Sequence, residues 1–316
     1  MTGFSPPDFR LYLFPILNSA IIHYQHCPAC NSASIGPVLT VTDYSVSNEK
    51  FEIWECSSCK LRFTQDVPDQ NSIGRYYQSP QYISHSNTKT GIVNKLYHLV
   101  RKFTLGQKKR LINNKTGLQK GKLLDIGAGA GTFAANMKNA GWSVTGLEPD
   151  ATTRAKAIQN YGIELQPSDQ LFQLIPQSYN AITMWHVLEH VHKLHDYLAE
   201  VKKLLKPGGV LFIAVPNYTS NDASRYQATW AAYDVPIHLY HFSPGSMKKL
   251  LDSHGLRVKS IQPMWFDSFY VSLLSEKNKT GKQQLVHGFL NGLISNIKAL
   301  TDKNKCSSLI YVVENL

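Results

Sequence analysis

A glycine-rich turn directly after a short apolar strand pattern is the feature that most constrains this 316-residue sequence. The strand pattern covers residues 122–126, and glycines follow it at alternate positions, Gly127, Gly129 and Gly131. Each glycine removes a side chain where the backbone must turn tightly beside a ligand. Residues 132–137 have the pattern of the helix that should follow, and a helix N-terminus suits the polar groups of a nucleotide. The order strand, turn and helix therefore predicts a nucleotide-binding site.

The spacing of the glycines separates several kinds of nucleotide site. A dinucleotide site uses G-x-G-x-x-G and a P-loop ends in G-K-[ST], and neither pattern is present in this turn. A second strand pattern, residues 142–147, ends on Glu148, which lies 23 positions after Asp125. An ionised carboxylate offers only acceptors, so it can take both hydroxyl donors of a ribose. We predict that Glu148 binds a ribose; the alternative is a solvated charge at a strand end.

Strand and helix patterns alternate along the rest of this region. Further strands are expected at 180–186 and 210–215, with a helix opening at 187–191. This alternation predicts an α/β fold with a doubly wound parallel sheet. A last pair of strand patterns, 257–261 and 309–313, is expected to close the sheet.

Two stretches lie between the members of this last pair. Residues 283–299 are expected to be helical. Residues 265–270 are apolar, which suits packing over the sheet, an acceptor pocket or a contact with lipid.

Four segments in this order, LLDIGAGAG, GLEP, MWHVLEHV and LLKPGG, resemble the class I S-adenosylmethionine (SAM) dependent methyltransferases over residues 120–260. The resemblance implies a Rossmann-like seven-stranded sheet with an antiparallel C-terminal edge hairpin, SAM as cofactor and methyl transfer as activity. One departure is Asn180, where the family usually has aspartate before the fourth strand. The cofactor residues that the resemblance implies are Asp125, Gly127, Ala128, Gly129, Gly131, Glu148, Pro149 and His186.

Four of the five cysteines form two C-x-x-C pairs, Cys27 with Cys30 and Cys56 with Cys59, separated by 25 residues. Each pair places two thiolates on one tight turn, and two such turns complete a tetrahedral zinc site. Residues 51–54 and 61–64 alternate as the strands of a small ribbon would. Disulfides are the alternative, which suits a secreted chain better. With four cysteine ligands the zinc would be structural rather than catalytic.

The zinc ribbon before the methyltransferase region resembles the arrangement in sugar C-methyltransferases. We therefore expect three parts: residues 1–69 with the ribbon, residues 70–119 as an aromatic and helical linker and cap, and residues 120–316 as the methyltransferase domain. Three tyrosines of the linker are expected to cap the cofactor pocket or to pack the linker against the domain: Tyr76, Tyr77 and Tyr82.

A first catalytic candidate is the H-x-x-E-H run of His186, Glu189 and His190. On a helix, this spacing places the three side chains along one face. The run resembles the E-x-x-E-H of ubiquinone-type O-methyltransferases and of small-RNA 2′-O-methyltransferases, in which a divalent ion activates a hydroxyl. With one carboxylate replaced by histidine, the site should favour an ion softer than Mg²⁺. The alternative is a helix cap that supports the sheet.

A second catalytic candidate is the histidine pair His238 and His241, which follows the fifth strand. An imidazole titrates near neutral pH and can serve as a general base. The segment resembles a histidine-rich stretch of sugar C-methyltransferases, in which His238 matches the second histidine. The Tyr-His-Glu before it is replaced by residues 235–237. Three residues are expected on the acceptor side: Trp230, Tyr233 and Asp234.

Charge and hydropathy limit the cellular setting only weakly. The net charge is +11, from 33 basic and 22 acidic residues, and the lysines are scattered. A basic balance fits nucleic acid, an acidic membrane surface or a phosphorylated substrate without selecting one. No apolar run reaches the roughly 20 residues of a membrane span. We expect Leu11–Ile22 to be a docking segment rather than a signal peptide, and the location to be cytoplasmic.

The sequence therefore predicts a SAM-dependent methyltransferase with a structural zinc ion. The favoured partner is a small-molecule acceptor, a sugar, polyketide-like or lipid-linked intermediate, with histidine-assisted transfer. The alternatives are a metal-dependent RNA or quinone-type O-methyltransferase, and a SAM-binding protein without turnover. Nucleic acid is the less favoured partner, and the oligomeric state is not predicted.

Overall fold

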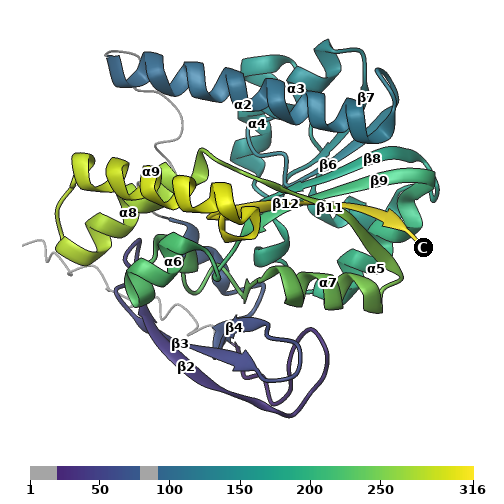
Figure 1. The fold of residues 1–316 in the computed structure, drawn as a ribbon. Helices are drawn as coiled ribbons and strands as arrows, with labels where there is room; N and C mark the ends of the chain where they lie inside the picture. Colours follow the sequence, from purple (N-terminus) through teal and green to yellow (C-terminus); the bar gives the residue numbers. More distant parts are fainter. Residues whose placement is uncertain (1–19, 79–91) are drawn as a thin grey trace, which may run out of the picture.

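A central six-stranded sheet organises the chain, whose computed structural model describes residues 20–78 and 92–316 (Figure 1). The strand order is β11-β12-β9-β8-β6-β7, and the four strands from β9 to β7 are parallel. β12 runs antiparallel to both β9 and β11, so the predicted edge hairpin is present. The strands are β6 Lys122–Ile126, β7 Ser143–Leu147, β8 Tyr179–Trp185, β9 Leu205–Pro216, β11 Leu256–Pro263 and β12 Ser308–Asn315.

The expectation of seven strands is wrong for the part of the chain that the structure describes. Beside β7, where the sheet ends, the chain makes only an isolated parallel bridge between Leu147 and Gln166. Gln166 donates to the carbonyl of Gly146 and accepts from the amide of Glu148. Pro167 comes next, has no N–H to continue a ladder, and precedes the 3₁₀ helix η2, Ser168–Gln173. The expected seventh strand is therefore reduced to a single bridge.

Helices cover both faces of the sheet (Figure 1). α2 and α3 pack on one face, where Ile112, Phe133 and Met137 meet the sheet residues Leu123 and Phe212. α5 and α7 pack on the other face. The helices are α2 Ile92–Thr116, α3 Thr132–Asn139, α4 Ala151–Tyr161, α5 Leu194–Leu204, α6 Asn221–Tyr226, α7 Pro244–Ser253, α8 Asp267–Thr280 and α9 Leu285–Thr301.

The helix expected to open at 187–191 is not formed. A single 3₁₀ turn, η3 Leu188–His190, replaces it, and α5 begins only at Leu194. His186 leaves β8 with a φ of 57°, in the left-handed region. A residue with this φ cannot lie within a right-handed helix, so His186 does not share a helical face with the residues that follow it.

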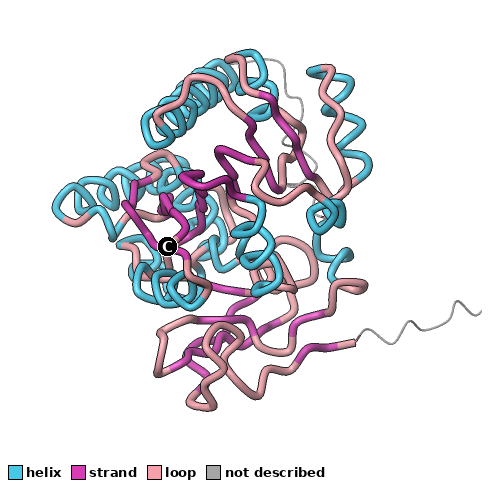
Figure 2. Tube along the Cα trace, turned by 90° about the vertical axis from the view of Figure 1, so that its right-hand side faces the viewer, coloured by secondary structure: helices cyan, strands magenta, loops and turns pink. Residues whose placement is uncertain are grey.

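A second, smaller sheet lies below the central one in the view of Figure 2. Its order is β10-β4-β3-β2, and β3 and β4 include the two predicted ribbon strands. β10, which follows β9 along the chain, pairs with β4 and so completes the ribbon's sheet. The strands are β2 Ile35–Thr42, β3 Lys50–Cys56, β4 Arg62–Thr64 and β10 Tyr240–His241, with a separate pair β1 Ile21–Ile22 and β5 Val67–Pro68.

The remaining elements are short or were not predicted. Residues 265–270, expected to be an apolar segment, include the first residues of α8, which was not predicted. α8 forms a hairpin with α9 between β11 and β12, and α9 confirms the helix expected at 283–299. None of the described helices is long and apolar enough to cross a membrane. Most of the segment Leu11–Ile22 lies outside the described residues. The other 3₁₀ turns are η1 Ile73–Tyr77, η4 Gln227–Thr229, η5 Ala231–Tyr233 and η6 Lys303–Lys305.

The contact between the two sheets can be tested by substitution of Thr64. Its hydroxyl donates to the carbonyl of His238 at 2.7 Å and lies 3.1 Å from Nε2 of His241, and all three residues are buried. Thr64→Val should leave these groups without a partner and lower the free energy of unfolding by about 1–3 kcal/mol. Urea denaturation measures this change. Thr40→Val on the exposed side of β2 is the control, and an equal effect in both variants would contradict the role of the hydroxyl.

Candidate active site

The glycine turn has the backbone geometry that its sequence predicts. Gly127, Gly129 and Gly131 have φ values of 70°, 54° and 77°, which favour glycine. A Cβ atom at Gly131 would lie 2.9 Å from the Cβ of Ala157 on α4, so this glycine lets the turn pack closely on the helix. A Cβ at Gly129 would meet no protein atom within 4 Å. The turn therefore leaves open space at Gly129, as a ligand-binding loop requires.

Glu148 lies beside this space at the end of β7. One carboxylate oxygen accepts the amide of Gly129 at 2.9 Å, and the other accepts the amide of Asp150 at 3.1 Å. Burial raises the pKa of Glu148, while these two amides favour its charged form. Each oxygen keeps a lone pair, so the carboxylate can still accept ribose hydroxyls. The neighbouring Pro149 carbonyl accepts from Nη1 of Arg154.

Asp125 and Ala128 connect the glycine turn to the strands on either side of β6. The hydroxyl of Thr183 on β8 donates to Asp125 at 2.7 Å, and burial raises the pKa of Asp125 to about 7. The amide of Ala128 donates to the carbonyl of Leu147 at 2.8 Å. These bonds tie the end of β6 to both neighbouring strands, so the glycine turn starts from a fixed point on the sheet edge.

His186 lies between two carboxylates. Its Nδ1 is 3.3 Å from Glu189 and its Nε2 is 3.0 Å from Asp267 at the start of α8. Burial opposes the imidazolium, but the hydrogen bonds to Asp267 and Glu189 prevail and raise the pKa of His186 to about 10. A protonated histidine has no lone pair for a metal. In the part of the chain that the structure describes, His186 is not among the residues whose ligand atoms converge with those of Glu189 and His190, so its expected place among three metal ligands gains no support.

His238 takes the place of His186 beside the other two residues. Ligand atoms of Glu189, His190 and His238 all lie within 4.8 Å of one another. Glu189 is fully buried, and within the described chain its Oε2 has no hydrogen-bond partner. The rings of His190 and His238 meet edge to face, with centroids 4.6 Å apart. The structure thus joins one residue from each of the two predicted histidine clusters around a buried carboxylate.

Backbone carbonyls fix the tautomers of both rings. Nδ1 of His190 lies 3.0 Å from the carbonyl of Ile237, and Nδ1 of His238 lies 2.9 Å from the carbonyl of Ala232. A carbonyl only accepts, so each Nδ1 carries the hydrogen and each Nε2 keeps a lone pair. Burial, together with the neighbouring His238, lowers the pKa of His190 to about 3. Neutral imidazoles held this way have the form that binds metals in proteins.

The comparisons with known proteins identify the family. Residues 100–261, about half of the chain, match the methyltransferase-domain family. The chain belongs to this family. It is a SAM-dependent methyltransferase, and the open space at Gly129 beside Glu148 fits the expected cofactor.

Several curated relatives and solved structures resemble this methyltransferase. The ubiquinone biosynthesis O-methyltransferase of Aeromonas salmonicida is 27% identical over 186 residues, 54% of this chain and 76% of that protein. The Aliivibrio fischeri protein of the same name is 31% identical over 173 residues, 50% of this chain and 73% of that protein. The magnesium protoporphyrin IX methyltransferase of Synechocystis with bound SAH superimposes with a TM-score of 0.51 at 13% identity. That match covers 78% of this chain and all of the other, and it supports the fold alone.

Other predicted site residues of the methyltransferase have structural partners. His241 points to Thr64 of the ribbon, and burial, with His238 and Arg62 nearby, holds its pKa well below the usual range. Trp230 is buried and donates to Asp222, and the hydroxyl of buried Tyr233 accepts from Arg62.

The remaining candidates include one residue close to the histidines. Asp234 accepts from the hydroxyl of Ser45 at 3.4 Å. Tyr76 hydrogen-bonds to Glu49 of the ribbon. The Tyr77 hydroxyl is 3.2 Å from Nδ1 of His190, so it contacts the group formed by Glu189, His190 and His238. Tyr82 lies outside the described residues.

Two residues near the cofactor turn were not predicted. Asp267 reaches His186 from α8, 81 positions further along the chain. Lys108 of α2 places its Nζ 4.1 Å from the ring centroid of Trp185, and burial lowers its pKa. Lys108 belongs to a run of basic residues whose pattern is typical of a solvated surface. No local feature of the sequence indicates that Lys108, rather than its neighbours, lies near the site.

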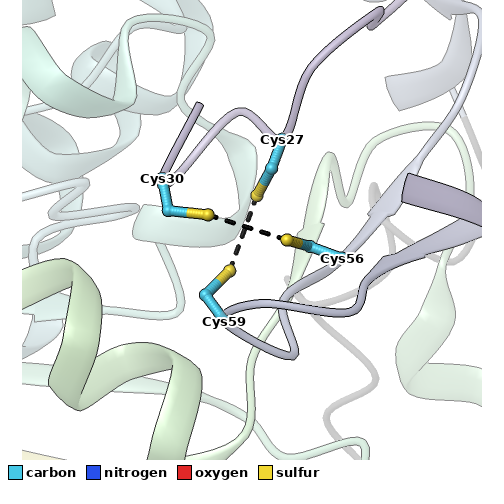
Figure 3. Close-up of side chains that lie close together, drawn as sticks. All are labelled: Cys27, Cys30, Cys56 and Cys59. Carbon is cyan, nitrogen blue, oxygen red and sulfur yellow. Dashed lines mark hydrogen bonds between the residues drawn. The ribbon is translucent and has the colours of Figure 1, made fainter. Parts of the chain in front are cut away.

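The four paired cysteines meet as the spacing predicts (Figure 3). Sγ of Cys27 lies 3.5 Å from that of Cys59, and Sγ of Cys30 lies 3.6 Å from that of Cys56. A tetrahedral zinc with Zn–S bonds of about 2.3 Å separates its sulfurs by about 3.8 Å. All four are free thiols in this structure, and the two sulfur–sulfur distances are well beyond the roughly 2.0 Å of a disulfide bond.

The cofactor residues are tested by binding of S-adenosylhomocysteine. Gly129→Asn should fill the open space yet fold, since asparagine tolerates a left-handed backbone. Glu148→Ala removes a buried carboxylate and should weaken binding by about 1.5–3 kcal/mol. Calorimetry measures both affinities, with exposed Glu164→Ala as the matched control. Wild-type affinity in both site variants would contradict the assignment.

Proposed function

We propose that this methyltransferase transfers the SAM methyl group to a hydroxyl of a small-molecule acceptor at a divalent metal held by Glu189, His190 and His238. The observation that carries the proposal is the convergence of two Nε2 lone pairs with a buried, unpartnered carboxylate oxygen within 4.8 Å. A buried carboxylate oxygen without a partner is costly, and a cation bound to Oε2 of Glu189 would satisfy it. The similarity to ubiquinone biosynthesis O-methyltransferases supports a small aromatic or lipid-linked acceptor.

The donor set favours a particular kind of ion. Two imidazoles and one carboxylate suit a divalent transition metal or zinc better than Mg²⁺, which prefers oxygen ligands. Such an ion, when bound, would act as a Lewis acid that lowers the pKa of the acceptor hydroxyl. Three ligands from the chain leave coordination positions for the acceptor.

Other residues of the site would position the cofactor and the Glu189 carboxylate. The glycine turn and Glu148 would orient the cofactor, and the reaction forms an O–CH₃ bond as the S–CH₃ bond breaks, giving S-adenosylhomocysteine. His186, clamped by Glu189 and Asp267, would hold the Glu189 carboxylate in place through Oε1 and leave Oε2 for the ion. The proton of the acceptor hydroxyl is lost to solvent or to a nearby base.

A metal-free route uses the same geometry. Nε2 of His238 keeps its lone pair because Nδ1 is fixed on Ala232, so His238 can accept the hydroxyl proton directly as a general base. The metal-bound and metal-free routes make different predictions, because a histidine that binds a metal cannot also accept a proton at that nitrogen.

Metal removal distinguishes the two routes. Under the metal route, chelation should abolish turnover, and a divalent ion should restore it. Glu189→Gln keeps the shape of the side chain but removes the anionic ligand, and should lower turnover at least about a hundredfold, since even outer-shell changes cost about 10–100-fold. Turnover is measured with labelled SAM across quinone-like, sugar and RNA acceptors. Retained affinity for S-adenosylhomocysteine confirms that the variant is folded.

A matched histidine variant controls this experiment. His238→Ala should abolish turnover by either route, whereas His23→Gln, on an exposed residue of the ribbon region, should leave it unchanged. Loss of activity in His238→Ala with no sensitivity to chelation or to Glu189→Gln would establish the general-base route instead. Full activity in both cluster variants would refute both.

We also propose that Cys27, Cys30, Cys56 and Cys59 bind one structural zinc ion per chain. The four sulfur atoms support this through their tetrahedral spacing, and zinc stabilises modules too small for a core of their own. Elemental analysis should find the ion in the wild type and in Cys306→Ala, and should not find it in Cys27→Ser. Cys27→Ser should also melt earlier than the wild type. Zinc-free wild-type protein with four reactive thiols would contradict the proposal.

A further inference from the structure

The helix α9 is oriented with its polar side inward. Its inner face consists of small residues that let α9 lie close to α8: a Cβ at Gly288 would be 2.7 Å from Cα of Leu273, and a Cβ at Gly292 would be 2.8 Å from Cα of Phe269. Such close backbone approach is possible only with glycine at both positions. The two helices form a hairpin beside the central sheet (Figure 1).

Buried hydrogen bonds fix this orientation. Asn291 donates to Glu276 of α8 at 2.7 Å, and the hydroxyl of Ser295 bonds to Asp222 of α6 at 3.1 Å. Rotation of α9 about its axis would break both bonds and drive large side chains into α8. The opposite face is therefore held outward by the packing of the fold.

That outward face is apolar along the whole helix. We call it the α9 apolar face, and it includes Leu285, Val286, Phe289, Leu293, Ile297 and Leu300. Their exposed fractions range from 38% at Leu293 to 69% at Val286 and Leu300. Monomeric soluble proteins rarely expose so continuous an apolar surface, which marks an interaction site.

The exposed charges around the α9 apolar face are mostly positive. No aspartate or glutamate occurs in α9 itself. Exposed lysines lie before the helix and at its end, and the neighbouring acids are Glu276, which is buried and hydrogen-bonded, and Asp302. The exposed lysines are Lys279, Lys282, Lys298, Lys303 and Lys305. An apolar helical face bordered by cations matches the interface of a bilayer that carries anionic headgroups.

We propose that the α9 apolar face docks the methyltransferase on the surface of an anionic lipid bilayer. A second copy of the chain is the less suited occupant, because pairing two such faces would bring lysines against lysines. The hairpin also reaches the candidate active site, since Asp267 at the start of α8 lies 3.0 Å from His186. Docking would thus bring the site close to lipid, whichever acceptor it takes.

Vesicle sedimentation with the full chain tests the proposal. Wild-type protein should bind phosphatidylcholine vesicles that contain about one third phosphatidylglycerol, and bind pure phosphatidylcholine much more weakly. The variant Phe289→Ser, Leu293→Ser, Ile297→Ser should lose at least about tenfold in affinity because apolar burial is lost. Ile175→Ser, which changes an isolated residue that is 75% exposed, should bind as the wild type does.

A second variant isolates the electrostatic part. Each lysine near an anionic surface contributes about fivefold to binding, so Lys279→Ala, Lys282→Ala, Lys303→Ala should weaken binding by about a hundredfold. All variants should keep their affinity for S-adenosylhomocysteine, which shows that they are folded.

Three results would overturn the proposal. The first is a wild-type chain that does not bind the anionic vesicles. The second is a serine variant that binds them as tightly as the wild type. The third is a wild-type dimer in sedimentation equilibrium that the serine substitutions dissociate, with no vesicle binding, since the face would then belong to a second copy.

Discussion

The pairing of β4 with the chain at residues 238–241 connects the ribbon to the candidate active site. The amide of Thr64 donates to the carbonyl of Leu239, and the amide of Leu239 donates to the carbonyl of Glu189. The hydroxyl of Thr64 adds a bond to the carbonyl of His238. One residue of the N-terminal module thereby sets the position of His238 relative to Glu189, although 174 positions separate Thr64 from His238. The geometry of the histidine and carboxylate cluster depends on this contact.

This connection gives the cysteine cluster a role beyond its own module. Cys56 ends β3, and the C-x-x-C turn that follows leads directly into β4. An ion that orders this turn would also order β4, and through β4 the backbone on both sides of His238. The proposed structural metal at the cysteines and the proposed catalytic arrangement at the histidines would then be two ends of one hydrogen-bonded path. The physical reason is that a short edge strand has little stability of its own and adopts the register that its neighbours impose.

Sequence patterns predicted those features whose chemistry is local. The glycine turn, the strand that ends on Glu148 and the two cysteine turns each lie within about ten residues, and the structure forms them where expected. The reduced seventh strand was missed, although Pro167 gave a local reason for it. The left-handed backbone of His186 was not predicted, because residues 186–190 have no feature that separates a left-handed residue and a 3₁₀ turn from the start of an α-helix.

Contacts between distant residues could not be predicted from spacing. His190 and His238 belong to separate motifs, and only the sheet edge and the β4 pairing bring their rings together. The salt bridge from Asp267 to His186 depends on α8, which was not predicted as a helix at all. The sequence analysis therefore treated the two histidine motifs as separate catalytic candidates. A linear pattern carries no information on which loops meet at the carboxyl edge of a parallel sheet.

Which face of α9 is buried could not be predicted from its sequence pattern either. Its amphipathic pattern, taken alone, places the apolar residues in the core, because that is where most such helices bury them. Gly288 and Gly292, with the polar residues Asn291 and Ser295 on the same side of the helix, provide a competing contact that is close and hydrogen-bonded. Close packing of α8 on α9 is available only to the small-residue face, so that face turns inward and the large apolar side chains turn outward. Within the described residues the apolar side of α9 therefore stays exposed, and the lysines around it favour the anionic surface proposed above.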